Sequence, residues 1–139
     1  MLDASERLTV WLIEDSPTDA FVIREALNTC EVAFEITLMA DGASALQALR
    51  GIEDDATTRV PDLLLLDLNL PKVTGTAVLA EVRKAVRCGG VPVIVVTSSD
   101  SPADMEAIRQ LGATAYFRKP HDLDQFLLLA NVVTEAIRK

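Results

Sequence analysis

The sequence predicts an α/β protein in which five parallel strands form one doubly wound sheet with helices on both faces. Short runs rich in leucine and β-branched residues alternate with stretches of helical periodicity, the pattern of repeated βα units. The third and fourth runs are apolar without alternation, as expected for strands that helices cover on both sides. Right-handed crossovers then wind a (βα)5 chain into such a sheet. The expected strands are 8–14, 32–39, 62–67, 91–97 and 114–118.

Two helix starts carry the same four-residue pattern. Ser16–Asp19 (SPTD) and Ser101–Asp104 (SPAD) each place a hydroxyl at the N-cap, a proline at the first helical position and an acid three residues after the hydroxyl. Helices are therefore expected directly after the first and fourth strands, the second of them ending in a left-handed cap at Gly112. The remaining helices are expected to follow Gly42, Gly75 and His121.

Length and charge restrict the function. The 139 residues suffice for one domain with a real core, and a hydrophobic content of 50% excludes disorder. We expect a single domain over 1–139, with its core at about 7–138 and no output domain. The net charge of −8 argues against binding to nucleic acid or to anionic lipid. The expected partners are proteins, cations or small molecules.

The sequence also predicts a cytoplasmic protein. Cys30 and Cys88 have no metal-like spacing, and so few thiols fit a reducing compartment. No apolar stretch approaches the roughly 20 residues of a membrane span. The start MLDASERLTV lacks the charged and then apolar layout of a signal peptide.

Acidic side chains follow two of the expected strands. Glu14 and Asp15 end the first strand, and Asp67 closes the third. The carboxyl ends of parallel strands meet at one edge of the sheet, where such folds bind ligands. Taken alone, these acids could simply stabilise helix N-termini. Clustered carboxylates repel one another, however, and a cation offsets that repulsion; magnesium suits the site because it needs few protein oxygens.

A hydroxyl and an ammonium group are expected at the same edge. Thr97 closes the fourth strand and Lys119 follows the fifth. Taken alone, Thr97 could be an ordinary β-branched strand residue, and Lys119 could be a solvated surface lysine. Beside Asp67 they predict phosphoryl chemistry, in which the carboxylate attacks phosphorus and the two groups donate to the equatorial oxygens.

These residues resemble the receiver domain of two-component response regulators, which has a flavodoxin-like fold, over nearly the whole chain. The segments VWLIEDSPTDAFVIREAL, LDLNLPKVTG and KPHDLDQF further resemble standalone regulators that partner bacterial phytochromes and related sensor histidine kinases. The features that carry the family resemblance are Glu14-Asp15, Asp67, Pro71, Gly75, Thr97-Ser98 and Tyr116-Phe117-Arg118-Lys119-Pro120.

The resemblance implies a role for each acidic residue. Asp67 is the phospho-acceptor, and its cofactor is Mg²⁺. Asp15, Asp67 and the backbone carbonyl of Asn69 are the implied magnesium ligands, with Glu14 helping through a water. Asn69 and Ser99 lie near the path of attacking water and are expected to tune the lifetime of the phosphoryl group.

The resemblance also implies a switch. Thr97 and Lys119 contact the phosphoryl oxygens, and Tyr116 turns inward when Thr97 is drawn toward the phosphate. The bond between Lys119 and Pro120 is expected to be cis, which would aim the lysine into the site.

The last helix predicts an interface. One face is expected to be core, and the other is more apolar than a solvated helix requires. Scattered surface leucines are common and would also explain it. Because the family often pairs through this helix and its neighbours, we expect a protein interface here, with a second copy of the chain or the kinase as the partner. The expected core residues are Leu123, Phe126, Leu127, Ala130, Val133 and Ile137, and the expected interface residues are Leu128, Leu129, Val132 and Ala136.

The sequence therefore predicts a single-domain response regulator that a sensor histidine kinase phosphorylates on Asp67. It would signal through changed protein contacts, and it would not be an enzyme beyond catalysing its own phosphoryl transfer and dephosphorylation. An alternative is an aspartyl-phosphate phosphatase of the haloacid dehalogenase type. Such enzymes need an acid two residues after the nucleophile, where this chain has Asn69. A receiver-like scaffold that is never phosphorylated is a third reading, and the complete acidic set argues against it.

Overall fold

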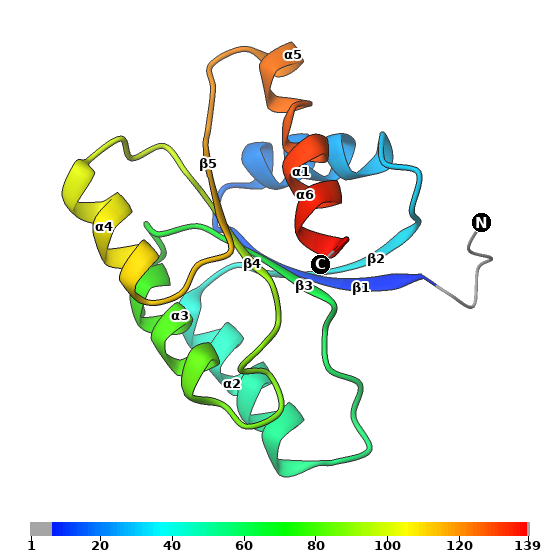
Figure 1. Ribbon diagram of the computed structural model, residues 1–139, viewed down its shortest axis with the longest axis vertical. Coiled ribbons are helices and arrows are strands. Elements are labelled where there is room, and N and C mark those ends of the chain that lie inside the picture. Colours follow the sequence, from blue (N-terminus) through cyan, green and yellow to red (C-terminus); the bar gives the residue numbers. More distant parts are fainter. Residues whose placement is uncertain (1–6, 139) are drawn as a thin grey trace.

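The five predicted strands form a single parallel sheet. A computed structural model describes residues 7–138. Its strands are β1 (Leu8–Ile13), β2 (Phe34–Met39), β3 (Leu63–Leu66), β4 (Val93–Thr97) and β5 (Ala115–Arg118). They lie in the order β2-β1-β3-β4-β5, and every neighbouring pair is parallel (Figure 1). The order reverses direction between β1 and β3, as in other doubly wound sheets, so the predicted fold class is confirmed.

Helices cover both faces of this sheet (Figure 1). Ser16 and Ser101 cap α1 and α4 as predicted, each accepting a hydrogen bond from the N–H three residues on. Gly112 has the predicted left-handed conformation, with φ of 88°. The helices are α1 (Pro17–Asn28), α2 (Gly42–Asp54), α3 (Gly75–Lys84), α4 (Pro102–Gln110), α5 (Leu123–Phe126) and α6 (Leu129–Ile137).

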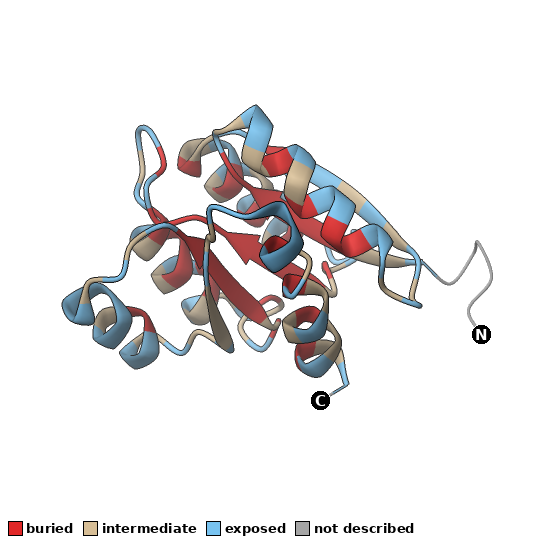
Figure 2. Ribbon diagram, turned by 90° about the horizontal axis from the view of Figure 1, so that it is seen from above, coloured by how far each residue is buried: buried red, intermediate tan, exposed pale blue. Residues whose placement is uncertain are grey.

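The core consists of two layers, one on each face of the sheet. Successive residues of a strand point to opposite faces, so Leu65 packs in the layer with α1 and α6 while Leu66 packs in the layer with α2 and α3. All residues of β3 and β4 are buried, as expected for central strands (Figure 2). This two-sided burial fixes the strand ends that carry the acidic residues.

The expected bounds of the domain stay a prediction. The expected domain of 1–139 includes residues 1–6 and 139, which lie outside the described residues. Within residues 7–138, none of the helices is long and apolar enough to cross a bilayer. Cys30 and Cys88 are both free thiols.

The last helical segment differs from the prediction. Leu127 and Leu128 interrupt it, which divides it into α5 and α6. The buried face is Phe126, Leu129, Val133 and Ala136, whereas Leu123, predicted as core, is exposed. The assignment of Leu129 and Ala136 to an interface is therefore wrong. Apolar residues occupy most of this helix, so its periodicity was compatible with two phases, and the predicted phase was shifted by about one residue.

Leu128 and Val132 remain available at the surface. Leu128 is 55% exposed, and Val132 is half-buried. The apolar face that the sequence predicted is thus reduced to these two residues of the original four.

Candidate functional site

Three carboxylates meet at the carboxyl edge of the sheet. The register of β1 and β3 pairs Ile13 with Leu66, and the N–H of Asp67 donates to the carbonyl of Ile13 at 3.1 Å. Glu14 and Asp67, the next residues on the two strands, therefore lie side by side. One carboxylate oxygen from each of Glu14, Asp15 and Asp67 lies within 4.8 Å of the other two. The predicted acidic cluster is present.

The cluster has the donor chemistry of a divalent-cation site. Glu14 and Asp67 are nearly buried, at 2% and 5% exposure, whereas Asp15 is exposed and open to solvent. Hard carboxylate oxygens at one open corner suit an ion such as Mg²⁺, which binds few protein oxygens and keeps several waters. The residues present therefore fit the ion that the sequence predicts.

The ammonium of Lys119 sits among the acids. Its Nζ lies 2.8 Å from Oε1 of Glu14, 2.8 Å from Oδ2 of Asp19 and 3.2 Å from Oδ2 of Asp67. Burial alone would lower the pKa of Lys119, but its hydrogen bonds to Asp19 and Glu14 raise that pKa above the usual value. The lysine is held as a cation beside the predicted acceptor.

Burial also raises the pKa of Glu14. Loss of solvent raises the pKa of Glu14 to about 7, although the hydrogen bond from Lys119 acts in the opposite direction. The nearby charge of Asp67 also contributes to this rise. Around neutral pH the cluster therefore resists carrying its full negative charge.

The backbone around Lys119 corrects one expectation. The structure has no cis peptide bond among the described residues, so the predicted cis bond before Pro120 is wrong. The lysine is positioned by the sheet instead. Its N–H donates to the carbonyl of Thr97 at 2.8 Å, continuing the β4–β5 ladder to the edge where Asp67 lies.

Asp19 is a site residue that the sequence does not predict. In a capping box the acid at the third helical position bonds back to the N–H of the N-cap residue. Here the N–H of Ser16 donates to Oε2 of Glu14 at 3.1 Å, which leaves the Asp19 carboxylate free to accept from Lys119. The SPTD pattern predicts a capping role for this acid, and it carries no signal of the contact with Lys119.

The second capping pattern behaves in the same way. The N–H of Ser101 donates to Oγ of Ser99 at 3.2 Å, and Ser99 Oγ donates to Oδ2 of Asp104 at 2.6 Å. The acid of the α4 cap is thereby directed to Ser99, which the family resemblance placed near the attacking water. Both cap acids contact residues predicted to take part in the chemistry.

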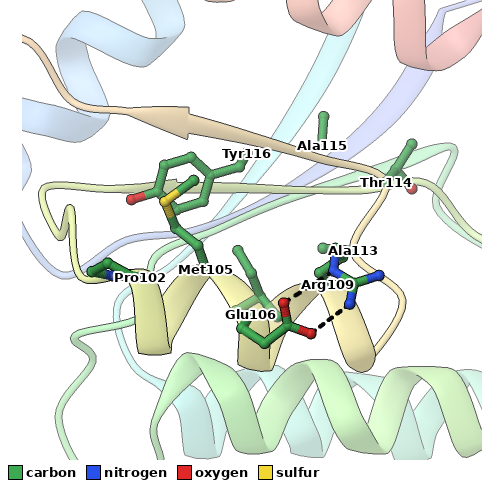
Figure 3. Close-up of a pocket in the computed structure, with 9 residues that line it drawn as sticks. Pro102, Met105, Glu106, Arg109, Ala113, Thr114, Ala115 and Tyr116 are labelled. Atoms are coloured by element: carbon green, nitrogen blue, oxygen red, sulfur yellow. Dashed lines mark hydrogen bonds and ion pairs between the residues drawn. The ribbon is translucent and has the colours of Figure 1, made fainter.

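Thr97 and Tyr116 are connected through the same loop. Thr97 is fully buried, and its hydroxyl accepts from the N–H of Ser99 at 3.3 Å. The hydroxyl of Tyr116 donates to the carbonyl of Ser99. Tyr116 also lines a groove of about 470 Å³ between α4 and β5, together with Met105 (Figure 3). The two predicted switch residues thus share one loop residue as hydrogen-bond partner.

The loop after Asp67 holds the acceptor by its backbone. The N–H of Asn69 donates to Oδ1 of Asp67 at 3.3 Å, and the N–H of Gly75 donates to the carbonyl of Leu68 at 2.9 Å. This orients one carboxylate oxygen of Asp67 while the other faces Lys119.

The sequence matches one known family over most of its length. The pattern of the response regulator receiver domain covers residues 10–131, so the chain belongs to the response regulator receiver family. The response regulator Rcp1 of Synechocystis sp. is 33% identical over 124 residues, which are 88% of this chain and 84% of that protein.

Solved structures give the same assignment. The phosphorylated cyanobacterial phytochrome response regulator RcpA has a TM-score of 0.83 at 33% identity, covering 93% of this chain and 92% of that one. The Mn²⁺-bound form of Rcp1 has a TM-score of 0.81 at 30% identity, covering 92% of each chain. This chain is therefore a two-component receiver domain homologous to Rcp1 and RcpA. A phospho-acceptor role fits its site, and the phosphatase alternative is not favoured.

Proposed function

We propose that Asp67 accepts a phosphoryl group from a phosphohistidine of a sensor histidine kinase. An Oδ atom of Asp67 forms a bond to phosphorus, while the bond between phosphorus and the imidazole nitrogen breaks and its electron pair stays on the imidazole. The observation that carries the proposal is the contact of 3.2 Å between Nζ of Lys119 and Oδ2 of Asp67 within a three-carboxylate cluster. A cation beside a carboxylate at an open edge is the arrangement that phosphoryl transfer requires.

The neighbouring residues would bind the metal ion, contact the phosphoryl oxygens and control the access of water. Glu14, Asp15, Asp67 and the backbone carbonyl of Asn69 would hold Mg²⁺, which supplies positive charge against the phosphoryl oxygens when bound. Nζ of Lys119 donates to one phosphoryl oxygen. The hydroxyl of Thr97 accepts from the Ser99 N–H and donates its own hydrogen to another phosphoryl oxygen. Ser99 and Asn69 control access of water to phosphorus, so they set the rate at which the phosphoryl group is lost.

The signal would leave through the groove between α4 and β5. Movement of Thr97 toward phosphorus pulls on Ser99, whose carbonyl holds the Tyr116 hydroxyl. Tyr116 lines the groove beside α4, so its inward turn changes that surface. Exposed Leu128 and half-buried Val132 then form part of a phosphorylation-dependent homodimer contact.

The expected partner is a phytochrome-type histidine kinase. This rests on the similarity to RcpA, which is a phytochrome response regulator. Contact between this protein and the kinase would take place in the cytoplasm. Residues 1–139 would form one receiver domain that acts through protein contacts rather than on a separate substrate.

Intact mass spectrometry tests the acceptor directly. The wild type is incubated with acetyl phosphate and Mg²⁺, beside Asp67→Asn. The wild type should gain the mass of one phosphoryl group, and the variant should gain none while keeping its fold by circular dichroism. A wild type that gains no mass would support the reading of a scaffold that is never phosphorylated.

A further inference from the structure

We propose that Asp19 is a positioning residue that competes with the phosphoryl group for Lys119. The inference rests on the proposed function of Asp67 as acceptor. It assigns to Asp19 a restraining role, in which its carboxylate holds the lysine before phosphorylation and gives it up when the phosphoryl group arrives.

Three carboxylates compete for the ammonium of Lys119. An ammonium has three N–H donors. Three carboxylates surround this one, from Glu14, Asp19 and Asp67, at 2.8, 2.8 and 3.2 Å. Nζ donates hydrogen bonds to Asp19 and Asp67, and it forms a close ion pair with Glu14. A phosphoryl oxygen on Asp67 therefore competes with Asp19 for the ammonium of Lys119.

Asp19 is the acceptor that can be replaced most easily. The side chain of Glu14 is 1% exposed and follows a central strand, so it has no room to turn away. Asp67 is itself the group that becomes phosphorylated. The side chain of Asp19 is 33% exposed and lies in the first turn of α1, so it can turn to solvent and be hydrated again.

The local hydrogen bonds show that this carboxylate is directed to the lysine rather than to the cap. Ser16 Oγ accepts the N–H of Asp19, which completes half of a capping box. The other half is missing because Glu14 takes the Ser16 N–H. Asp19 therefore contributes a negative charge near the position of the incoming phosphoryl dianion, and it occupies one of the donors that would stabilise that dianion.

Removal of this competitor should favour the phosphorylated state. With Asp19→Asn or Asp19→Ala, one N–H of Lys119 is released, and Glu14 and Asp67 still hold the ammonium. Binding of beryllofluoride with Mg²⁺, measured by calorimetry, should tighten by about two- to fivefold, the range expected for a partly exposed ion pair. The rate of phosphorylation by acetyl phosphate should rise in the same direction, as the Asp67 oxygen bonds to phosphorus and acetate leaves with its electron pair.

Two control variants separate this role from a structural one. Asp19→Glu keeps a carboxylate and should stay near the wild-type affinity. Glu25→Gln removes the same charge from an exposed position of α1, where Glu25 accepts a hydrogen bond from Asn28, and should change nothing. A purely structural role for Asp19 would lower the melting temperature of Asp19→Asn without tightening beryllofluoride binding.

The outcomes are distinguishable. Unchanged or weaker beryllofluoride binding in both Asp19→Asn and Asp19→Ala overturns the inference, as does an equal gain in Glu25→Gln. If the wild type binds no beryllofluoride and takes up no phosphoryl group, the proposed function of Asp67 fails and the inference fails with it. A phosphorylated wild type with an indifferent Asp19 contradicts this inference alone.

Discussion

The backbone of Gly75 packs directly on the main-chain carbonyl of Asp67. A Cβ placed at Gly75 would lie 2.0 Å from that oxygen, and backbone atoms cannot yield as a flexible side chain can. The first residue of α3 thus sets the position of the acceptor, and any side chain there must move the loop between them.

This relationship predicts opposite effects for two glycine-to-alanine changes. Gly75→Ala should destabilise the fold by about 1–3 kcal/mol, as overpacking does, and should slow phosphorylation because Asp67 shifts. Gly51→Ala lies inside α2 with nothing within 4 Å of the new Cβ, so it should stabilise by about 0.5–1 kcal/mol. Urea unfolding measures both, and equal stability of the two variants would contradict the contact.

Magnesium should stabilise the native state. An ion that binds only the folded acidic cluster at about 100 times its Kd adds about 2.7 kcal/mol. Asp15→Ala should remove most of this gain because it deletes the exposed ligand. Asp54→Ala, which changes an exposed acid on α2 outside the cluster, should keep the gain. Melting curves with and without millimolar Mg²⁺ measure the gain in stability. An unchanged Tm for the wild type would contradict the proposed metal site.

The raised pKa of Glu14 predicts that the stability of the metal-free protein depends on pH. Its pKa is about 7 in the fold, above the ordinary value of 4.5, so the folded state retains a proton that the unfolded chain releases. The contribution of protonated Glu14 to the stability of the folded state is fully present below pH 4.5, and it is lost as pH rises through 7. Glu14→Gln should therefore gain stability relative to wild type in EDTA at pH 8.5 and gain little at pH 4.5. A gain of equal size at both values would refute the raised pKa.

Self-association should depend on Leu128 and Val132. Beryllofluoride with Mg²⁺ should shift the wild type toward a dimer in analytical ultracentrifugation, and Leu128→Glu or Val132→Glu should weaken that shift by adding a charge to the contact. Leu38→Glu is the matched control, because Leu38 is exposed on β2 at the opposite edge of the sheet from β5. One monomeric species throughout would leave contact with other proteins as the only use of this face.

The sequence predicted the sheet and the acidic cluster because their signals are local. Apolar runs identify β3 and β4, and acids that end neighbouring parallel strands must meet at one edge. Glu14, Asp67 and Lys119 were therefore brought together by topology alone. The cap patterns at Ser16 and Ser101 were equally readable, since each depends on four consecutive residues.

The errors arose where the outcome depends on tertiary context. The phase of α6 depends on which apolar face the sheet accepts, and a helix that is apolar on several faces does not specify it, so Leu129 was assigned to the surface. The role of Asp19 depends on Glu14 taking the N–H of Ser16, a contact made when β1 and α1 are both in place. The isomer of the Lys119–Pro120 bond likewise cannot be read from residue identity.

Chemical trapping of the acyl phosphate tests the central claim most directly. Wild-type protein is treated with acetyl phosphate and Mg²⁺, reduced with borohydride and digested, and the peptides are sequenced by mass spectrometry. Reduction converts a phosphorylated aspartate to homoserine, so the account predicts homoserine at position 67 and unmodified Glu14 and Asp15. Conversion at Asp15, or at none of the three carboxylates, would contradict the assignment of Asp67 as the phospho-acceptor.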